Sequence, residues 1–443
     1  MSLPTNLLTI ENTLRDLYSQ KRPHSLVWRI ELIIVGHPWQ PALLDELEIF
    51  PKFVWKSRFA QAPLAGIGQV LSGGLEEMQA VLEQAEEGTC LFGGMRFDSA
   101  RPPSEEWEDF PEELFFIPQW EITPVAEGLR LALHGKHGEG LPPNMADFLT
   151  TLFPETHKQP HQISTEPAVA VTRSDRPGFQ DWSNAVDSAL QEISNGHFEK
   201  VVLARESRLQ FLSPVAPFQF FEKLTSSASR CFHFCIQPTA SSGAFLGVSP
   251  ELLVRRQGRT IESEAIAGTR PRSLDMAEDL RLERQLLEVP KERHEHQVVV
   301  DALERTFAHF CTHHEVSAQP QVLKLARLQH LQTGITGELR PSVSDATILA
   351  HLHPTPATCG RPSDAALRFL RNTETFDRGW YAGPIGMVSK TTAEFAVAIR
   401  SIHIRNLDMD VFAGAGIVDA SNAENEWAEL ECKISAPLHL LNL

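Results

Sequence analysis

The stretch 411–433, VFAGAGIVDASNAENEWAELECK, constrains the fold more than any other part of this chain. Its apolar start predicts a strand, its glycines allow another group to approach the main chain closely, and its end predicts a helix. Glu426, Glu429 and Lys433 recur at i, i+3 and i+7, so they share one helical face. Such a face is either solvated, as runs of charge usually are, or it is one wall of a site for an anionic substrate and a metal ion. Spacing alone leaves both interpretations open.

A second acidic pair lies in the segment 274–310, which predicts two helices separated at Pro290. Glu292 and Glu295 begin an i, i+3, i+7, i+11 pattern whose later members are apolar, so both carboxylates lead into a core-facing stripe. Unpaired charges seldom enter such a stripe. Four carboxylates from two helices would repel one another unless a cation joined them, and ligation by oxygen alone suits Mg²⁺. The two acidic pairs therefore predict a magnesium site.

Composition limits the possible partners. The chain has 443 residues, 42% of them hydrophobic, so it can bury a large core. Its net charge of −17 argues against a nucleic acid or an anionic membrane as partner, because both select basic surfaces. Six scattered cysteines without zinc-ligand spacing indicate a reducing cytoplasm. No signal peptide is recognisable, and no apolar window reaches the length of a membrane span.

The chain divides into two parts around a polar, proline-bearing stretch. Residues 1–153 mix short helices and strands, and they contain no nucleophile elbow, P-loop or dinucleotide fingerprint, so this part is expected to be scaffold. Residues 154–178 are predicted to be a linker. Residues 179–443 form the second part, which starts with a predicted amphipathic helix over 179–194.

Three charged residues in strand-like segments are candidates for chemistry. Lys200 starts the strand 199–211 and is either a solvated edge charge or a buried base with a lowered pKa. Glu251 follows a Ser-Pro turn and is either a turn glutamate facing water or a desolvated carboxyl that acts as a general acid. Arg400 lies in the apolar run 395–404, a predicted strand, where a guanidinium needs a carboxylate partner from the protein or from a substrate.

In their order along the chain, nine motifs resemble the chorismate-utilising enzymes, which include isochorismate, salicylate, anthranilate and aminodeoxychorismate synthases. The motifs are EKVVLAR, FLGVSPELL, EAIAGTRPR, KERHEH, LHPTPA, FDRGWYAGPIG, AIRSIHI, FAGAGIV and ENEWAELECK. They cover residues 179–443, whereas the first 150 residues resemble the family loosely, through FPKFVWKSR and LFGGMRFD. The resemblance implies an α/β (α+β) fold, in which two packed β-sheets flanked by helices form one large unit and both parts contribute strands.

Single positions favour one member of this family. Relatives that add ammonia usually carry glutamine at the position of Lys200, so the lysine indicates an enzyme that adds water and needs no glutaminase subunit. Aminodeoxychorismate synthases carry a nucleophilic lysine where this chain has Ala267, and salicylate synthases tend to have threonine where it has Ala357. The resemblance therefore implies an isochorismate synthase. The alternatives are a salicylate synthase, which goes on to eliminate pyruvate, and a catalytically silent chorismate-binding homologue.

The resemblance also implies a role for each site residue. Lys200 is the expected general base and Glu251 the expected general acid. Glu295 and Glu429 are the expected direct ligands of Mg²⁺, with Glu292 and Glu426 acting through water. The remaining expected contacts of chorismate are Arg400, Tyr381 and the Gly414 backbone at the enolpyruvyl carboxylate, Lys433 at the ring carboxylate, His330 at the ring, and Ala267, Gly268, Thr269 and Ala357 around it.

Three uses of isochorismate stay open at this point: menaquinone, a catechol siderophore and salicylate. The loose similarity of the first 150 residues favours menaquinone. Small-molecule chorismate is the expected partner, and the oligomeric state is left open.

Overall fold

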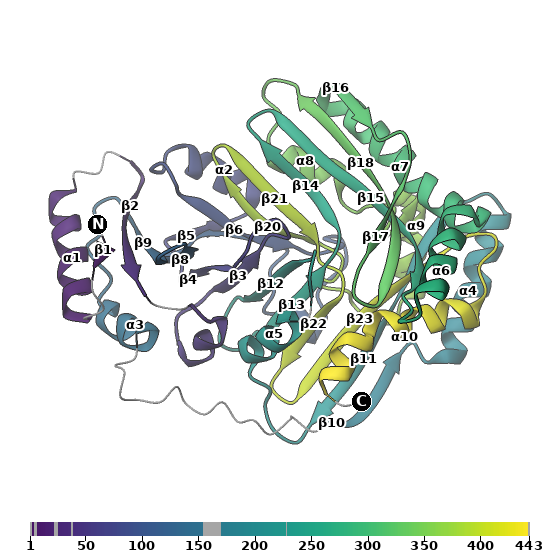
Figure 1. Cartoon of the computed structure of the whole chain (residues 1–443), viewed down its shortest axis with the longest axis horizontal. Helices are drawn as coiled ribbons and strands as arrows, with labels where there is room; N and C mark the ends of the chain where they lie inside the picture. The colour runs from purple at the N-terminus through teal and green to yellow at the C-terminus, as the bar shows by residue number, and fades with distance from the viewer. Residues whose placement is uncertain are drawn as a thin grey trace.

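Two large β-sheets pack face to face, and helices cover their outer faces (Figure 1). The computed structural model describes residues 2–3, 7–21, 25–36, 39–153, 170–226 and 228–441. The N-terminal elements and the C-terminal helix lie at opposite ends of the long axis, and the sheets run through the middle (Figure 1). The expected α/β arrangement of two packed sheets with helices outside is confirmed.

Among the described residues, the larger sheet has 13 strands. In spatial order they are β1 (Ser2–Leu3), β2 (Val27–Val35), β9 (Gly128–Lys136), β8 (Trp120–Val125), β4 (Leu64–Ile67), β3 (Lys52–Lys56), β12 (Phe232–Gln237), β13 (Ala244–Ser249), β22 (Ser401–Arg405), β23 (Asp408–Ile417), β11 (Lys200–Phe211) and β10 (Ala170–Arg176), with β19 (Gly360–Arg361) paired to the start of β11. The pairings are antiparallel apart from β1 with β2.

The smaller sheet has ten strands in the described part of the chain. Their order is β16 (Cys311–Val316), β18 (Leu328–Leu339), β15 (Thr260–Pro271), β14 (Leu252–Gln257), β21 (Thr392–Val397), β20 (Pro384–Ser389), β6 (Cys90–Met95), β7 (Glu113–Ile117) and β5 (Leu71–Gly73), with β17 (Gln321–Lys324) paired to β18.

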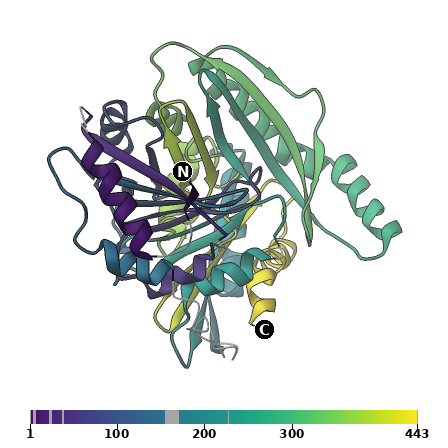
Figure 2. The same ribbon diagram turned by 60° about the vertical axis from the view of Figure 1, so that its left-hand side comes forward.

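Helices pack on both sheets from outside. The larger sheet carries α1 (Leu7–Gln20), α3 (Met145–Leu152), α4 (Phe179–Ser194), α5 (Pro217–Ser226), α9 (Ser363–Thr373) and α10 (Ala423–Leu440), and the smaller sheet carries α2 (Leu75–Glu83), α6 (Met276–Glu288), α7 (Pro290–Phe310) and α8 (Asp345–Leu352). Two short 3₁₀ turns are η1 (Pro41–Glu46) and η2 (Glu105–Trp107). The turned view shows α6 and α7 along the side of the smaller sheet (Figure 2). The helix 179–194 and the two helices separated at Pro290 match their predictions.

Aromatic side chains fill the space between the sheets. Phe53 of β3 lies 5.6 Å from Phe92 of β6, measured between ring centroids, so this contact joins the two sheets. Trp107 stacks on His403 of β22 at 4.3 Å. All four side chains are buried. Large aromatic surfaces of this kind contribute much of the free energy of folding, because their burial removes apolar area from water.

Strands from the N-terminal 153 residues enter both sheets. β3 pairs with β12 in the larger sheet, and β6 pairs with β20 in the smaller one. The scaffold part and the chorismate-binding part predicted from the sequence therefore share their sheets.

The linker prediction for 154–178 was wrong at its C-terminal end. Residues 154–169 lie outside the described residues, but Ala170–Arg176 form strand β10, antiparallel to β11. The polar side chains of β10 form ion pairs with other elements: Arg173 pairs with Glu431 of α10, and Arg176 pairs with Glu206 of β11. A strand secured by distant charges shows no apolar alternation, so the sequence pattern missed it.

Within the described residues, no helix has the length and apolar character needed to cross a membrane.

Candidate active site

The candidate site lies where two chain segments pass from one sheet to the other. Glu251 lies between β13 of the larger sheet and β14 of the smaller one. Arg400 lies between β21 of the smaller sheet and β22 of the larger one. The two crossings run side by side, because Glu251 O accepts from Val397 N and Arg400 O accepts from Val248 N, both at 3.2 Å. This geometry places a carboxyl and a guanidinium at one point between the sheets.

The predicted strand 395–404 was wrong at Arg400. β21 ends at Val397, and Arg400 has φ +53°, a left-handed conformation directly before β22 begins at Ser401. An apolar alternating run carries no local signal of such a break. Its cost in backbone energy, typically about 1–3 kcal/mol, is the kind of strain that tertiary contacts hold at functional sites.

A cavity opens at this crossing. Most of the predicted site residues line it: Glu251, Ala267, Gly268, Thr269, Glu295, His330, Ala357, Tyr381, Arg400, Gly414, Glu429 and Lys433. Lys200, Glu292 and Glu426 lie outside this lining. Lys200 forms an ion pair with the lining residue Glu295, whereas Glu292 pairs with Arg270 and Glu426 pairs with Lys291. Segments from 251 to 433 thus converge on one space.

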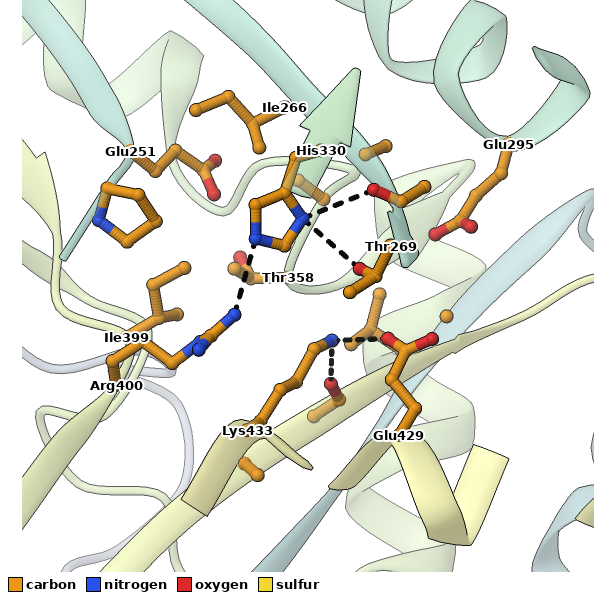
Figure 3. A pocket seen from close by; sticks show the side chains of 18 of the residues that line it. Glu251, Ile266, Thr269, Glu295, His330, Thr358, Ile399, Arg400, Glu429 and Lys433 are labelled. Carbon is orange, nitrogen blue, oxygen red and sulfur yellow. Dashed lines mark hydrogen bonds and ion pairs between the residues drawn. The ribbon is translucent and has the colours of Figure 1, made fainter. Parts of the chain in front are cut away.

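Glu251 is a buried carboxyl at one side of this cavity (Figure 3). Only 4% of its surface is exposed, so the interpretation as a solvated turn glutamate is wrong. Burial, followed by the negative charge of Glu264, raises the pKa of Glu251 to about 8, although Lys200 and Lys433 act in the opposite direction. The carboxyl is therefore protonated near neutral pH, which is the state that a general acid needs.

Lys200 lies next to Glu295, outside the lining of the cavity. Its exposed fraction is 1%, so the solvated-edge interpretation is wrong: β11 is covered at this point by its pairing with β23 and β19. Nζ lies 3.0 Å from Oε1 of Glu295. Burial opposes the ionisation of Glu295, but the ion pair and hydrogen bond from Lys200 outweigh it and lower the pKa of Glu295.

Gly416 makes room for this ion pair. A Cβ atom at Gly416 would lie 2.5 Å from Oε1 of Glu295 and 2.9 Å from Cε of Lys200, closer than real Cβ contacts allow. The bare backbone of β23 therefore lets the carboxylate and the lysine chain meet against it.

The four acids on α7 and α10 each have a cationic partner. Besides Glu295 with Lys200, the pairs are Glu429 with Lys433 at 2.6 Å, Glu426 with Lys291 at 2.6 Å, and Glu292 with Arg270 at 2.9 Å. Glu426 is 2% exposed, so the solvated interpretation of its helix face is wrong there. Among the described residues, no three acidic, histidine or cysteine side chains lie close enough together to hold a metal ion in this arrangement.

The donor set nevertheless fits a divalent cation once these pairs open. Burial raises the pKa of Glu292 to about 7, and the charges of Glu295 and Glu429 add to this effect although Arg270 opposes it. Burial and Glu429 likewise raise the pKa of Glu426. Carboxylates that repel one another in a partly desolvated site, with oxygen as the only donor atom, suit Mg²⁺.

His330 orients Arg400 in the middle of the cavity (Figure 3). Nδ1 of His330 lies 3.2 Å from Gly268 O, a pure acceptor, so Nδ1 carries the hydrogen and Nε2 accepts from Nη2 of Arg400 at 3.4 Å. Burial, with the charges of Arg400 and Lys433, lowers the pKa of His330 to about 3, so the ring is neutral. In the part of the chain that the structure describes, no carboxylate forms an ion pair with Arg400, which leaves its guanidinium for an anionic ligand.

Lys433 and Tyr381 complete the wall beside β23. Lys433 donates to Gly414 O at 2.7 Å while it pairs with Glu429, so its ammonium is held at the cavity (Figure 3). The ring of Tyr381 stacks on Phe412 with centroids 5.3 Å apart. The phenol oxygen would lie 2.8 Å from a Cβ at Gly414, so glycine at that position leaves space for the hydroxyl.

Some lining residues were not predicted. Thr358 places a hydroxyl at the cavity. Gly416 was expected only to leave the backbone bare, not to line a site. The other unpredicted lining residues are Val202, Pro250, Ile266, Ile399, Phe412 and Ala413. Thr358 directly follows Ala357, which could have drawn attention to it. The apolar residues carry no such signal, because their patterns match ordinary core strands.

Comparison with known proteins agrees with this geometry. The family model described as chorismate binding enzyme matches residues 61–442, and the chain belongs to this family. The resemblance drawn from the sequence motifs is thereby confirmed.

Individual relatives are similar over nearly the whole chain. The isochorismate synthase MenF of Bacillus subtilis is 30% identical over 448 residues, which cover 92% of this chain and 93% of the relative. The salicylate biosynthesis isochorismate synthase of Pseudomonas aeruginosa is 34% identical over 434 residues, covering 91% and 89%. The solved structure of MenF, the menaquinone-specific isochorismate synthase from Escherichia coli, aligns with a TM-score of 0.84 at 28% identity and covers 98% of this chain and 100% of that chain.

The contact at Gly416 yields a prediction. Gly416→Ala should displace Glu295 and Lys200 and reduce kcat/KM for the reaction of this site by about 10²-fold, the order expected for an ångström-scale misplacement. Gly178→Ala is the matched control, because a Cβ there meets nothing within 4 Å. Steady-state kinetics with thermal melts measure both variants, and a Gly416→Ala enzyme as active as the control would contradict the role given to this glycine.

Proposed function

We propose that this protein is an isochorismate synthase, which converts chorismate to isochorismate. The observation that carries the proposal is a pair of buried proton-transfer groups at one cavity: Glu251, which lines it and is protonated near neutral pH, and Lys200, which contacts the lining residue Glu295. Between them, Arg400 and Lys433 present two cations to a substrate with two carboxylates. The relatives that carry the name isochorismate synthase support the same activity.

The reaction adds a hydroxyl at C2 of the ring and removes the hydroxyl at C4. Lys200 takes a proton from a water molecule, whose oxygen bonds to C2 of chorismate. The ring double bonds shift, the C4–O bond breaks, and Glu251 gives its proton to the departing hydroxyl, which leaves as water. Hydroxide alone is a poor leaving group, so an acid opposite the base is required; each partner of this kind typically supplies about 10²–10⁴-fold.

Nζ of Lys200 lies 3.0 Å from Oε1 of Glu295, so this contact must open before Nζ can face the attacking water. Arg400, oriented by His330, and Tyr381 bind the enolpyruvyl carboxylate. Lys433 lies where the ring carboxylate meets the acids of α10.

Mg²⁺ is the proposed cofactor. Glu295 and Glu429 would hold it directly, and Glu292 and Glu426 would hold it through water. When bound, the ion would supply positive charge that attracts the ring carboxylate. The all-oxygen donor set and the raised pKa of Glu292 support this assignment.

The proposed pathway is menaquinone synthesis, in the cytoplasm. Relatives named MenF, among them the menaquinone-specific enzyme of Escherichia coli, support the pathway. Six free cysteines suit a reducing compartment. Water as the nucleophile requires no partner that delivers ammonia.

Product identification tests the activity. Incubation with chorismate and Mg²⁺, followed by chromatography, should yield isochorismate. Accumulation of salicylate with pyruvate would instead assign the protein as a salicylate synthase, and no turnover would leave a silent chorismate-binding homologue. Lys200→Ala and Glu251→Gln should each lower kcat by about 10²-fold or more while chorismate still binds in the presence of Mg²⁺. Near-normal turnover in either variant would refute the assigned roles.

The pKa of Glu251 determines the alkaline limit of activity. A general acid must be protonated, so kcat/KM should fall as the pH rises through about 8 and should stay high below it until another group titrates. A pH profile of kcat/KM from 6 to 10 measures this limb. A kcat/KM that already falls steadily from pH 6, as an acid with the ordinary carboxyl pKa of about 4 would give, or one that stays level up to pH 10, would exclude this role for Glu251.

Metal removal tests the four acids. EDTA should abolish activity and Mg²⁺ should restore it, because the acids would otherwise repel the ring carboxylate. Calorimetric titration of the protein with Mg²⁺ should lose its signal in Glu295→Gln. Full activity in metal-free buffer would contradict the magnesium site.

A further inference from the structure

Behind the proposed general acid lies an ion pair that joins two distant parts of the chain. Arg58, in the turn between β3 and β4, forms a bidentate pair with Glu264 of β15: Nη1 to Oε1 at 2.6 Å and Nη2 to Oε2 at 2.7 Å. The two side chains are 13% and 5% exposed. Both lie outside the cavity lining in the described part of the chain, so neither contacts substrate there.

This pair binds the backbone on both sides of Glu251. Nη1 of Arg58 also donates to Pro250 O at 3.1 Å, and Oε1 of Glu264 accepts from Leu252 N at 2.9 Å. The peptide groups that precede and follow Glu251 are therefore attached to one rigid, planar unit.

Other contacts fix the remaining groups of this short crossing. Glu251 N donates to Oγ of Ser249 at 3.2 Å, and Glu251 O accepts from Val397 N. Gln332 Nε2 donates to Oε2 of Glu264, so the carboxylate of Glu264 receives hydrogen bonds from three elements. Gln332 is two residues from His330 on β18, and Ile266, two residues from Glu264, lines the cavity.

We propose that Arg58 and Glu264 are positioning residues for Glu251, and that through Arg58 the N-terminal part of the chain sets the geometry of the acid step. This inference rests on the proposed function. It gives the N-terminal part, which carries none of the proposed catalytic residues, a direct role in the reaction.

Electrostatics adds a second role for Glu264. The charged and titratable groups that act on Glu251 are Glu264 from β15, Lys200 from β11 and Lys433 from α10, and Tyr381 lies near it as well. Of these, Glu264 alone carries negative charge, and it raises the pKa of Glu251 while the two lysines lower it. Glu264 thus favours the protonated acid as well as holding its backbone.

Three variants and one control separate positioning from general stability. Arg58→Met removes both contacts, Arg58→Lys keeps the charge without the planar fork, and Glu264→Gln keeps the shape without the charge. The control is Glu262→Gln, on the same strand two residues away, which breaks the half-exposed pair with Arg255 and leaves the backbone of Glu251 untouched. All four are compared with the wild-type chain by thermal melts, product analysis, kcat and KM for chorismate, the pH profile and hydrogen exchange.

In folded protein, Arg58→Met should lower kcat about tenfold or more with KM changed less than about twofold, because the acid is misplaced and the substrate contacts remain. Arg58→Lys should fall between it and the wild type. Glu264→Gln should move the alkaline limb of kcat/KM to lower pH, since losing a negative neighbour lowers the pKa of Glu251. Amides over 249–255 should exchange faster in Arg58→Met than in the control.

The opposite results would overturn the inference. Folded Arg58→Met and Glu264→Gln enzymes with the kcat and pH profile of the Glu262→Gln control would show a purely structural pair. Amide exchange over 249–255 that is unchanged in Arg58→Met would also contradict the positioning role. This measurement does not depend on activity, so it still tests the proposal if a variant is too unstable for kinetics. A wild-type chain that makes no isochorismate would instead overturn the proposed function, whereas isochorismate from wild type and variants alike would remove only the positioning role.

Discussion

Charge burial is the constraint on which the rest of this structure depends. Ionisable groups at the centre of a large protein are tolerated only when an opposite charge neutralises them or when they stay uncharged. Lys200 and Glu295 meet the first condition, and so do Lys291 and Glu426. Glu251 meets the second, because its burial keeps the carboxyl protonated near neutral pH. The same arrangements that make the fold possible hold the proposed base, the proposed acid and the proposed oxygen ligands of the metal at one site.

Sheet crossing turns these groups into a site. Glu251 lies in the short stretch that joins β13 to β14, and Arg400 lies in the short stretch that joins β21 to β22, so each stands where the chain passes from one sheet to the other. Because the two crossings are hydrogen-bonded to each other, the carboxyl and the guanidinium face one cavity. The helices α7 and α10 then bring the four acids toward the same cavity from outside the sheets. The site depends on both sheets at once, which explains why strands from the first 153 residues belong to the same unit.

Short-range patterns in the sequence predicted the helices and the acidic residues that share a helix face. Helical spacing placed Glu292 with Glu295 and Glu426 with Glu429 correctly on shared faces, and Pro290 correctly divided α6 from α7. Motif resemblance identified the family and the charged and polar side chains that line the cavity apart from Thr358, but it missed most of the apolar lining. Local pattern could not decide whether a charge faces water, because burial is set by what packs over it. The interpretation of Lys200 as a solvated edge charge was therefore wrong.

By itself, the sequence determined the helices with their paired acids, the family and the identity of the acid–base candidates, since all of these depend on short-range spacing or on motifs. Tertiary structure alone decided the partners of the charges, the left-handed break at Arg400 and the support of Glu251 by Arg58 and Glu264. The last two residues are 206 positions apart in the chain. No local periodicity relates such residues, because their contact exists only after both sheets have formed. Once both side chains are buried, each charge needs the other, because an unpaired buried charge is costly.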